Sequence, residues 1–153
     1  MRRSSVTEAV SYTHLYASIH GNTKKAAAQM KEILEERGAK KVVLTDLSRD
    51  DTSKALADAF RFDKVVLAAA SYDGGVFPCM ESFLLNLSHK NYQNRKIGIM
   101  ENGSWAPCAG RVMRGLLEPM KNITVCENVV TIKSTIKDEN IHQMKELADE
   151  LLG

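Results

Sequence analysis

The stretch Lys64-Val65-Val66-Leu67-Ala68-Ala69-Ala70 contains the longest apolar run of the chain. The run has no alternating polar residues, and such a run predicts a strand that is covered on both faces. It is far too short to span a bilayer as a helix. We therefore expect a strand of a parallel sheet that lies between two layers of helices.

Four further segments have the composition of strands, and five have the apolar periodicity of helices. The strands are predicted at residues 15–18, 42–47, 96–100 and 124–132. The helices are predicted at residues 23–37, 51–60, 78–87, 110–120 and 138–152. This alternation predicts an α/β fold, a doubly wound five-stranded parallel sheet (order 2-1-3-4-5) with helices on both faces. The residues just before the first strand are polar, and we expect His14 to lie in a loop or at an edge.

The length and composition are those of one globular domain. The 153 residues include 21 Lys and Arg against 19 Asp and Glu, a net charge of +2 with no basic block, and this excludes an evident nucleic-acid partner. We expect residues 1–11 to be a polar N-terminal lead-in and residues 12–153 to form the domain. Since no segment predicts a signal peptide or a membrane span, the expected location is cytoplasmic, with no membrane partner.

The cysteines and histidines are scattered along the chain. Cys79, Cys108 and Cys126 form no CxxC pair, which argues against a disulfide framework and against a zinc or iron–sulfur site. Cys79 and Cys108 are expected to be packing residues, because no His or cation that would activate a thiol adjoins them. The histidines form no diiron motif, so neither a metal ligand nor a catalytic side chain is assigned.

In a doubly wound sheet, ligands bind at the carboxyl ends of the strands. The loop after the first strand offers hydroxyls, an amide and backbone N–H groups at the start of a helix, which suits a phosphate monoester. Its residues are Ser18, Ile19, His20, Gly21, Asn22 and Thr23. The absence of GxGxxG and of GxxxxGK disfavours a dinucleotide and a nucleoside triphosphate. The alternative interpretation is a helix cap by Asn22 or Thr23.

The loops after the third and fourth strands are expected at the same edge. One contains a tyrosine and two adjacent glycines, and the other contains the only Trp of the chain. Their candidate residues are Ser71, Tyr72, Asp73, Gly74, Gly75, Asn102, Gly103, Ser104 and Trp105. A phosphate site with two aromatic side chains fits a flat ring that bears a phosphate tail, as in flavin mononucleotide (FMN). A flexible turn at Tyr72 and a core position for Trp105 are the structural alternatives.

The sequence resembles the flavodoxin family, whose phosphate loop ends in Gly-Asn-Thr, as Gly21-Asn22-Thr23 does here. More narrowly, it is similar to the flavodoxin-like domain of the flavodiiron (A-type) flavoproteins, in segments 16–23, 70–78 and 102–105. The resemblance covers roughly residues 15–152. It implies FMN as the cofactor.

The resemblance also implies a role for each candidate residue. The backbone N–H of Ile19 would bind the phosphate together with Ser18, His20, Gly21, Asn22 and Thr23. The ring would be flanked by Tyr72 and Trp105, and its polar edge would be bound by Asn102, Gly103 and Ser104. A carbonyl of Gly74 or Gly75 would turn to accept a hydrogen bond from ring N5, because a glycine peptide turns easily. Asp73 would disfavour an anionic ring.

The function implied is that of an FMN-binding electron-transfer flavoprotein domain. A diiron domain is the candidate acceptor and a rubredoxin-like protein the candidate donor, as in a flavodiiron-type oxidoreductase. A slightly basic chain favours a domain within a larger assembly over a free shuttle. The alternative is a flavodoxin-like NAD(P)H:quinone or azo reductase. A phospho-relay receiver is excluded because the first strand is followed by no acidic pair, and a module that has lost its flavin is disfavoured by the intact Gly21-Asn22-Thr23 and Trp105.

Overall fold

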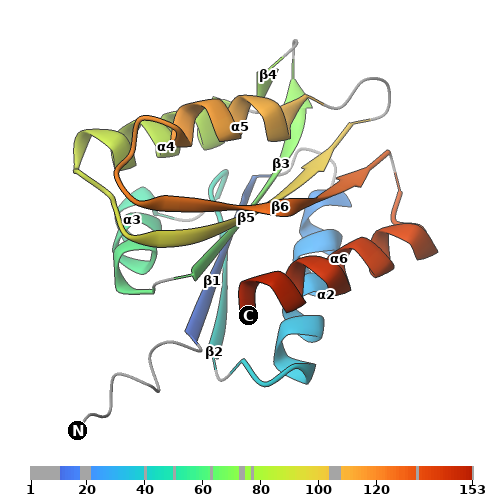
Figure 1. Cartoon of the computed structure of the whole chain (residues 1–153). Coiled ribbons are helices and arrows are strands. Elements are labelled where there is room, and N and C mark those ends of the chain that lie inside the picture. Colours follow the sequence, from blue (N-terminus) through green and yellow to red (C-terminus); the bar gives the residue numbers. More distant parts are fainter. Residues whose placement is uncertain are drawn as a thin grey trace, which may run out of the picture.

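The computed structural model of the chain describes residues 11–17, 22–39, 41–49, 51–62, 64–72, 75–76, 78–103, 108–133 and 135–152. Strands and helices alternate through these ranges (Figure 1). In chain order they are β1 (Ser11–Ala17), α2 (Asn22–Glu36), β2 (Lys41–Asp46), α3 (Thr52–Arg61), β3 (Lys64–Tyr72), β4 (Gly75–Val76), α4 (Pro78–His89), β5 (Arg95–Asn102), α5 (Ala109–Leu117), β6 (Ile123–Ile132) and α6 (Asp138–Leu152).

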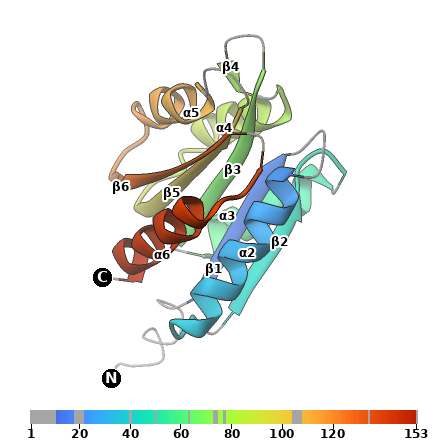
Figure 2. The same cartoon turned by 90° about the vertical axis from the view of Figure 1, so that its right-hand side faces the viewer.

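The parallel strands follow the order β2-β1-β3-β5-β6, and the short β4 pairs antiparallel with the end of β3. Counted among the parallel strands alone, this is the order 2-1-3-4-5, so the predicted topology is confirmed. Helices α2 and α6 cover one face of the sheet and α3, α4 and α5 cover the other, as the two views show (Figures 1 and 2). The carboxyl ends of β1, β3 and β5 therefore lie at one edge.

The apolar run in β3 is buried on both faces, as its sequence predicts. Val65, Leu67 and Ala69 pack in the core under α3, α4 and α5. Val66 and Ala68 pack in the second core, under α2 and α6. All five residues are at most 2% exposed. Burial on both faces explains why β3 has no polar alternation.

The expectation for His14 is wrong. Strand β1 begins at Ser11, and His14 is paired with Leu44 of β2 and with Val66 of β3. The residue therefore lies in a strand with neighbours on both sides. Pairing with two strands satisfies the backbone hydrogen bonds of β1, and this tertiary pairing outweighs the polar composition of the segment.

A register shift interrupts the pairing of β5 with β6 between Ile97 and Ile99. On β6 the backbone N–H groups of Glu127 and Asn128 donate to the two carboxylate oxygens of Glu150, at 2.8 and 3.0 Å. Burial opposes ionisation of Glu150, but the bonds from Asn128 and Glu127 outweigh it, and the pKa of Glu150 is lowered. Helix α6 thus provides acceptors for N–H groups that the bulged strand leaves unpaired.

Candidate functional site

The first candidate loop leads into the start of α2. Ser18, Ile19, His20 and Gly21 lie outside the described residues. Helix α2 begins at Asn22, and Thr23 is 3% exposed. The first turn has no acidic side chain and carries the exposed Lys24 and Lys25. A helix start with positive charge and without a carboxylate is the chemistry that a phosphate requires.

The second candidate loop contains a hairpin that the sequence analysis did not predict. Strand β3 extends to Tyr72, where Ser71 pairs with Val76 and Tyr72 with Gly75 of β4. Asp73 and Gly74 lie outside the described residues. An Asp-Gly pair between strand residues is a strong hairpin signal, so this element could have been found from the sequence.

The carbonyl of Gly75 is already engaged. The thiol of Cys108 donates to it at 3.4 Å between sulfur and oxygen. Turning this carbonyl toward a ligand would break that bond. The bond to Cys108 therefore argues against Gly75 as the glycine whose carbonyl turns toward a ligand.

The third candidate loop connects β5 with α5. Asn102 ends β5, and the backbone N–H of Gly103 donates to the carbonyl of Ile132 at 3.0 Å. Ser104 and Trp105 lie outside the described residues. The chain is described again from Cys108, the residue that precedes α5. The loop therefore leaves the sheet beside the last residue of β6.

The second and third loops are tied together at the start of α5. The side-chain oxygen of Ser71 accepts hydrogen bonds from the backbone nitrogens of Cys108 and Ala109, at 2.8 and 3.1 Å. The next N–H, that of Gly110, donates to the carboxylate of Glu101 at 2.8 Å. These bonds satisfy N–H groups that have no partner within the helix. The start of α5 is thus occupied by the protein.

Glu101 is a further residue at this edge of the sheet, and the sequence analysis did not assign it to the candidate site. Its second carboxylate oxygen accepts from the hydroxyl of Thr131 at 2.7 Å. Glu101 lies one residue before Asn102, and a carboxyl group at the end of a buried strand was the available signal. Its partners, on α5 and β6, are distant in sequence and become evident only in the folded chain.

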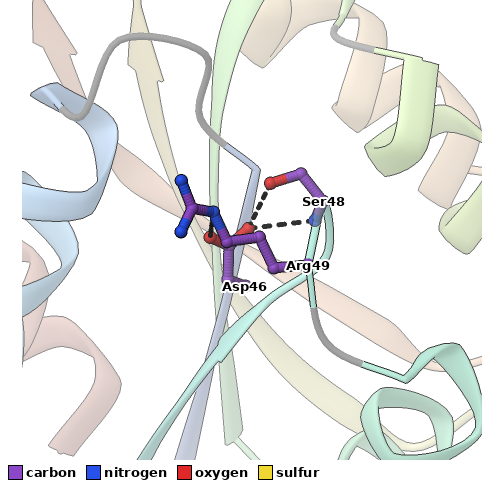
Figure 3. Close-up of polar contacts among 3 residues, drawn as sticks. All are labelled: Asp46, Ser48 and Arg49. Carbon is purple, nitrogen blue, oxygen red and sulfur yellow. Dashed lines mark hydrogen bonds and ion pairs between the residues drawn. The ribbon is translucent and has the colours of Figure 1, made fainter.

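Three polar residues, Asp46, Ser48 and Arg49, contact one another at the end of β2 (Figure 3). One carboxylate oxygen of Asp46 accepts from the backbone nitrogen of Ser48 at 2.9 Å and from its hydroxyl at 2.6 Å. The side chain of Arg49 is 82% exposed, and its Nε lies 3.9 Å from the other carboxylate oxygen. This Asx-turn holds a cation at the carboxyl edge, and the Asp-x-Ser spacing was its sequence signal.

The three cysteines are free thiols. Burial, and secondarily the charge of Asp46, raises the pKa of Cys79. Burial, and secondarily the charge of Glu150, raises the pKa of Cys126 to about 11. Both thiols are therefore protonated near neutral pH, as expected of packing residues.

Neither a metal-binding cluster nor a membrane-spanning helix is found among the described residues. In these ranges no group of three His, Cys, Asp or Glu side chains could hold a metal ion. No helix of the same ranges is long and apolar enough to cross a membrane.

Fold and loops together define a doubly wound α/β protein with its candidate ligand site at the carboxyl edge of the sheet. The sequence model described as a flavodoxin domain matches residues 14–104, more than half of the chain. The chain therefore belongs to the flavodoxin domain family, and the predicted resemblance is confirmed. No curated protein matches the sequence.

Solved structures with the same fold fall into two groups. The rubredoxin oxygen:oxidoreductase of Desulfovibrio gigas has a TM-score of 0.86 and 18% identity over 94% of this chain, but over 35% of its own. The Flv1 flavodiiron core of Synechocystis sp. PCC6803 has a TM-score of 0.81 and 14% identity over 95% of this chain and 36% of its own. A flavodoxin from the domain Archaea has a TM-score of 0.79 and 17% identity over 93% of this chain and 96% of its own.

These identities show the fold. The chain spans about a third of the length of the first two structures and nearly the whole length of the flavodoxin. The structural neighbours therefore include both flavodiiron proteins and a flavodoxin.

Proposed function

We propose that this chain binds FMN at the carboxyl edge of its sheet and transfers electrons to a redox partner. The observation that carries the proposal is its membership of the flavodoxin domain family, through a match over residues 14–104 that includes parts of all three candidate loops. FMN supplies reversible electron uptake in single-electron steps, whereas the protein supplies binding, orientation and electrostatics.

The phosphate would be held at the start of α2. Binding would use the hydroxyls of Ser18 and Thr23, the side chains of His20 and Asn22, and backbone N–H groups, including those of Ile19 and Gly21. The described start of α2 fits this role, because it has two lysines and no acidic residue in its first turn. The start of α5 does not fit, because Ser71 and Glu101 already accept from its N–H groups.

The ring would lie between the second and third loops. Tyr72 and Trp105 would flank it, and Asn102, Gly103 and Ser104 would bind its polar edge. Asp73 would place a negative charge near it, and the carbonyl that turns toward ring N5 would be that of Gly74, because the carbonyl of Gly75 is bonded to Cys108. Ser71 and Gly75 would act through the loop that they shape.

The redox partners that we propose follow from the flavodiiron neighbours. A diiron domain would accept the electrons, and a rubredoxin-like protein would donate them, within a flavodiiron-type oxidoreductase. The support is that two structural neighbours are a rubredoxin oxygen:oxidoreductase and a flavodiiron core. We further propose a cytoplasmic location and a domain that spans residues 12–153.

A comparison of FMN with riboflavin tests the site. The purified chain should bind FMN and give a flavin spectrum, and it should bind riboflavin more weakly, because much of the site addresses the phosphate. Thr23→Ala removes one hydrogen bond to a charged group and should weaken FMN binding by roughly 1.5–3 kcal/mol. Thr52→Ala, at the start of α3, is the matched control and should leave affinity unchanged. Equal affinities for riboflavin and FMN would refute the phosphate site.

Turnover separates electron transfer from the reductase alternative. The isolated chain with FMN should be bleached reversibly by dithionite and reoxidised slowly in air. It should reduce quinones with NAD(P)H only slowly, because the sequence has no GxGxxG loop for a nicotinamide. Fast NAD(P)H-dependent turnover would overturn the electron-transfer proposal in favour of the quinone or azo reductase.

A further inference from the structure

The carboxylate of Glu101 joins three elements of the fold. Glu101 is the residue before the last of β5, Gly110 belongs to the first turn of α5, and Thr131 is the residue before the last of β6. One carboxylate oxygen accepts from the backbone N–H of Gly110 at 2.8 Å, and the other accepts from the hydroxyl of Thr131 at 2.7 Å. Both oxygens of a single side chain are therefore used to hold α5 against the ends of two strands.

The absence of a side chain at Gly110 is part of this arrangement. A Cβ at position 110 would lie 2.9 Å from the carboxylate oxygen of Glu101 and 3.2 Å from its Cδ. Real Cβ atoms essentially never approach another heavy atom so closely, so a side chain at position 110 would force the bonded carboxylate of Glu101 to shift. The small size of Gly110 thus allows the backbone of α5 to approach the carboxylate of Glu101 closely.

Within the described ranges, no cation pairs with the carboxylate of Glu101. Among the described residues, the ion pairs involve Asp46, Asp58, Glu146 and Asp149, and none involves Glu101. Its partners are an N–H group and a hydroxyl, which stabilise the carboxylate without cancelling its charge. The edge therefore carries a fixed negative charge one residue before Asn102, where the polar edge of the ring is proposed to bind.

We propose that Glu101 is a positioning residue of the flavin site, which holds the start of α5 in place and disfavours the reduced ring through its charge. The second part rests on the proposed function. Reduced flavin is anionic, so a nearby carboxylate weakens its binding more than that of the neutral oxidised form. By linkage, weaker binding of the reduced form lowers the reduction potential of the bound flavin.

Two substitutions separate the charge from the hydrogen bonds. Glu101→Gln removes the charge, but its amide can accept from Gly110 and donate to Thr131, whose hydroxyl rotates to accept. Thr131→Val keeps the charge and removes one donor. Glu127→Gln, on the exposed bulge of β6, changes the net charge equally but lies away from the carboxyl edge. Each variant is titrated with oxidised and with reduced FMN, and the two dissociation constants are compared.

The measured quantity is the dissociation constant of reduced FMN divided by that of oxidised FMN. We expect Glu101→Gln to lower this ratio at least about threefold below that of the parent chain. Thr131→Val and Glu127→Gln should change this ratio less than twofold. An unchanged ratio in Glu101→Gln, or an equal change in Thr131→Val or Glu127→Gln, would overturn the role of the charge. A merely structural residue would alter the stability of the chain without altering this ratio.

Hydrogen exchange tests the positioning role without any flavin. The amide proton of Gly110 should exchange slowly in the parent chain and in Glu101→Gln, and at least about tenfold faster in Glu101→Ala. Unchanged exchange in Glu101→Ala would refute the contact. If the parent chain bound no FMN, both the proposed function and the proposed effect of the charge would be refuted. The exchange rate of the Gly110 amide would still show whether Glu101 holds α5 in place.

Discussion

The side-chain oxygen of Ser71 lies 2.8 Å from the backbone nitrogen of Cys108 and accepts its hydrogen bond. The same oxygen accepts from Ala109 at 3.1 Å, so one hydroxyl at the end of β3 caps the start of α5. The thiol of Cys108 in turn donates a hydrogen bond to the carbonyl of Gly75, in the β3–β4 hairpin. The second and third candidate loops therefore form one hydrogen-bonded unit.

Replacing Ser71 with Ala should destabilise the chain, because two N–H groups of α5 lose their acceptor. We expect the free energy of unfolding to fall by about 1–3 kcal/mol, measured by urea denaturation. Ser82→Ala, on the exposed face of α4, is the matched control and should change it by less than about 0.5 kcal/mol. Equal effects of the two substitutions would show that the Ser71 cap contributes nothing.

Two glycines of α5 should respond oppositely to alanine. At Gly110 the added Cβ meets the hydrogen-bonded carboxylate of Glu101 at 2.9 Å. Gly110→Ala should therefore lower the free energy of unfolding by about 1–3 kcal/mol, and the melting temperature should fall with it. At Gly115 a Cβ meets nothing within 4 Å, and Gly115→Ala should stabilise the helix by about 0.5–1 kcal/mol. Stabilisation by both would mean that Glu101 moves aside freely.

Glu150 should stabilise the chain in a pH-dependent way. Its pKa is below the ordinary value of 4.5, since hydrogen bonds from β6 outweigh the effect of burial. A lowered pKa stabilises the folded state above the ordinary value, and the stabilisation is lost as the pH falls through the folded value. Glu150→Gln should therefore be less stable than the parent chain at pH 7, and the difference should shrink below pH 4.5.

Urea denaturation at several pH values measures this effect. Glu32→Gln on α2 is the control, because its side chain is exposed and it lies on a different helix from Glu150. A difference between Glu150→Gln and the parent chain that stayed constant from pH 7 to pH 3 would contradict the linkage.

Cys126 should make the chain sensitive to alkali. Burial, and then the charge of Glu150, raises the pKa of its thiol from 9.0 to about 11, so the folded chain holds this proton more tightly than the unfolded chain does. The resulting stabilisation is complete below pH 9 and is lost as the pH rises through about 11. Relative to Cys126→Ala, the parent chain should lose stability across this interval, as thermal melts at stepped pH would show. Parallel pH profiles would contradict the raised pKa.

The sequence predicts the topology because local signals suffice for it. The apolar run of β3 and the three- to four-residue periodicity of the helices identify the elements, and alternation then selects the parallel sheet. The extent of β1 was missed, because the polar residues from Ser11 to His14 become strand only through pairing with β2 and β3. The β3–β4 hairpin was missed although Asp73-Gly74 is a local signal for it.

What the sequence determined by itself is the chemistry available at one edge of the sheet, since β1, β3 and β5 of a parallel sheet must end together. What only the tertiary structure decided is which polar groups are already used there. Ser71 is bonded to Cys108, Gly75 to the Cys108 thiol, and Glu101 to both Gly110 and Thr131. The physical reason is that a hydrogen bond acts over about 3 Å, so its partners are set by the packing of α5 on the sheet and not by their spacing in the chain.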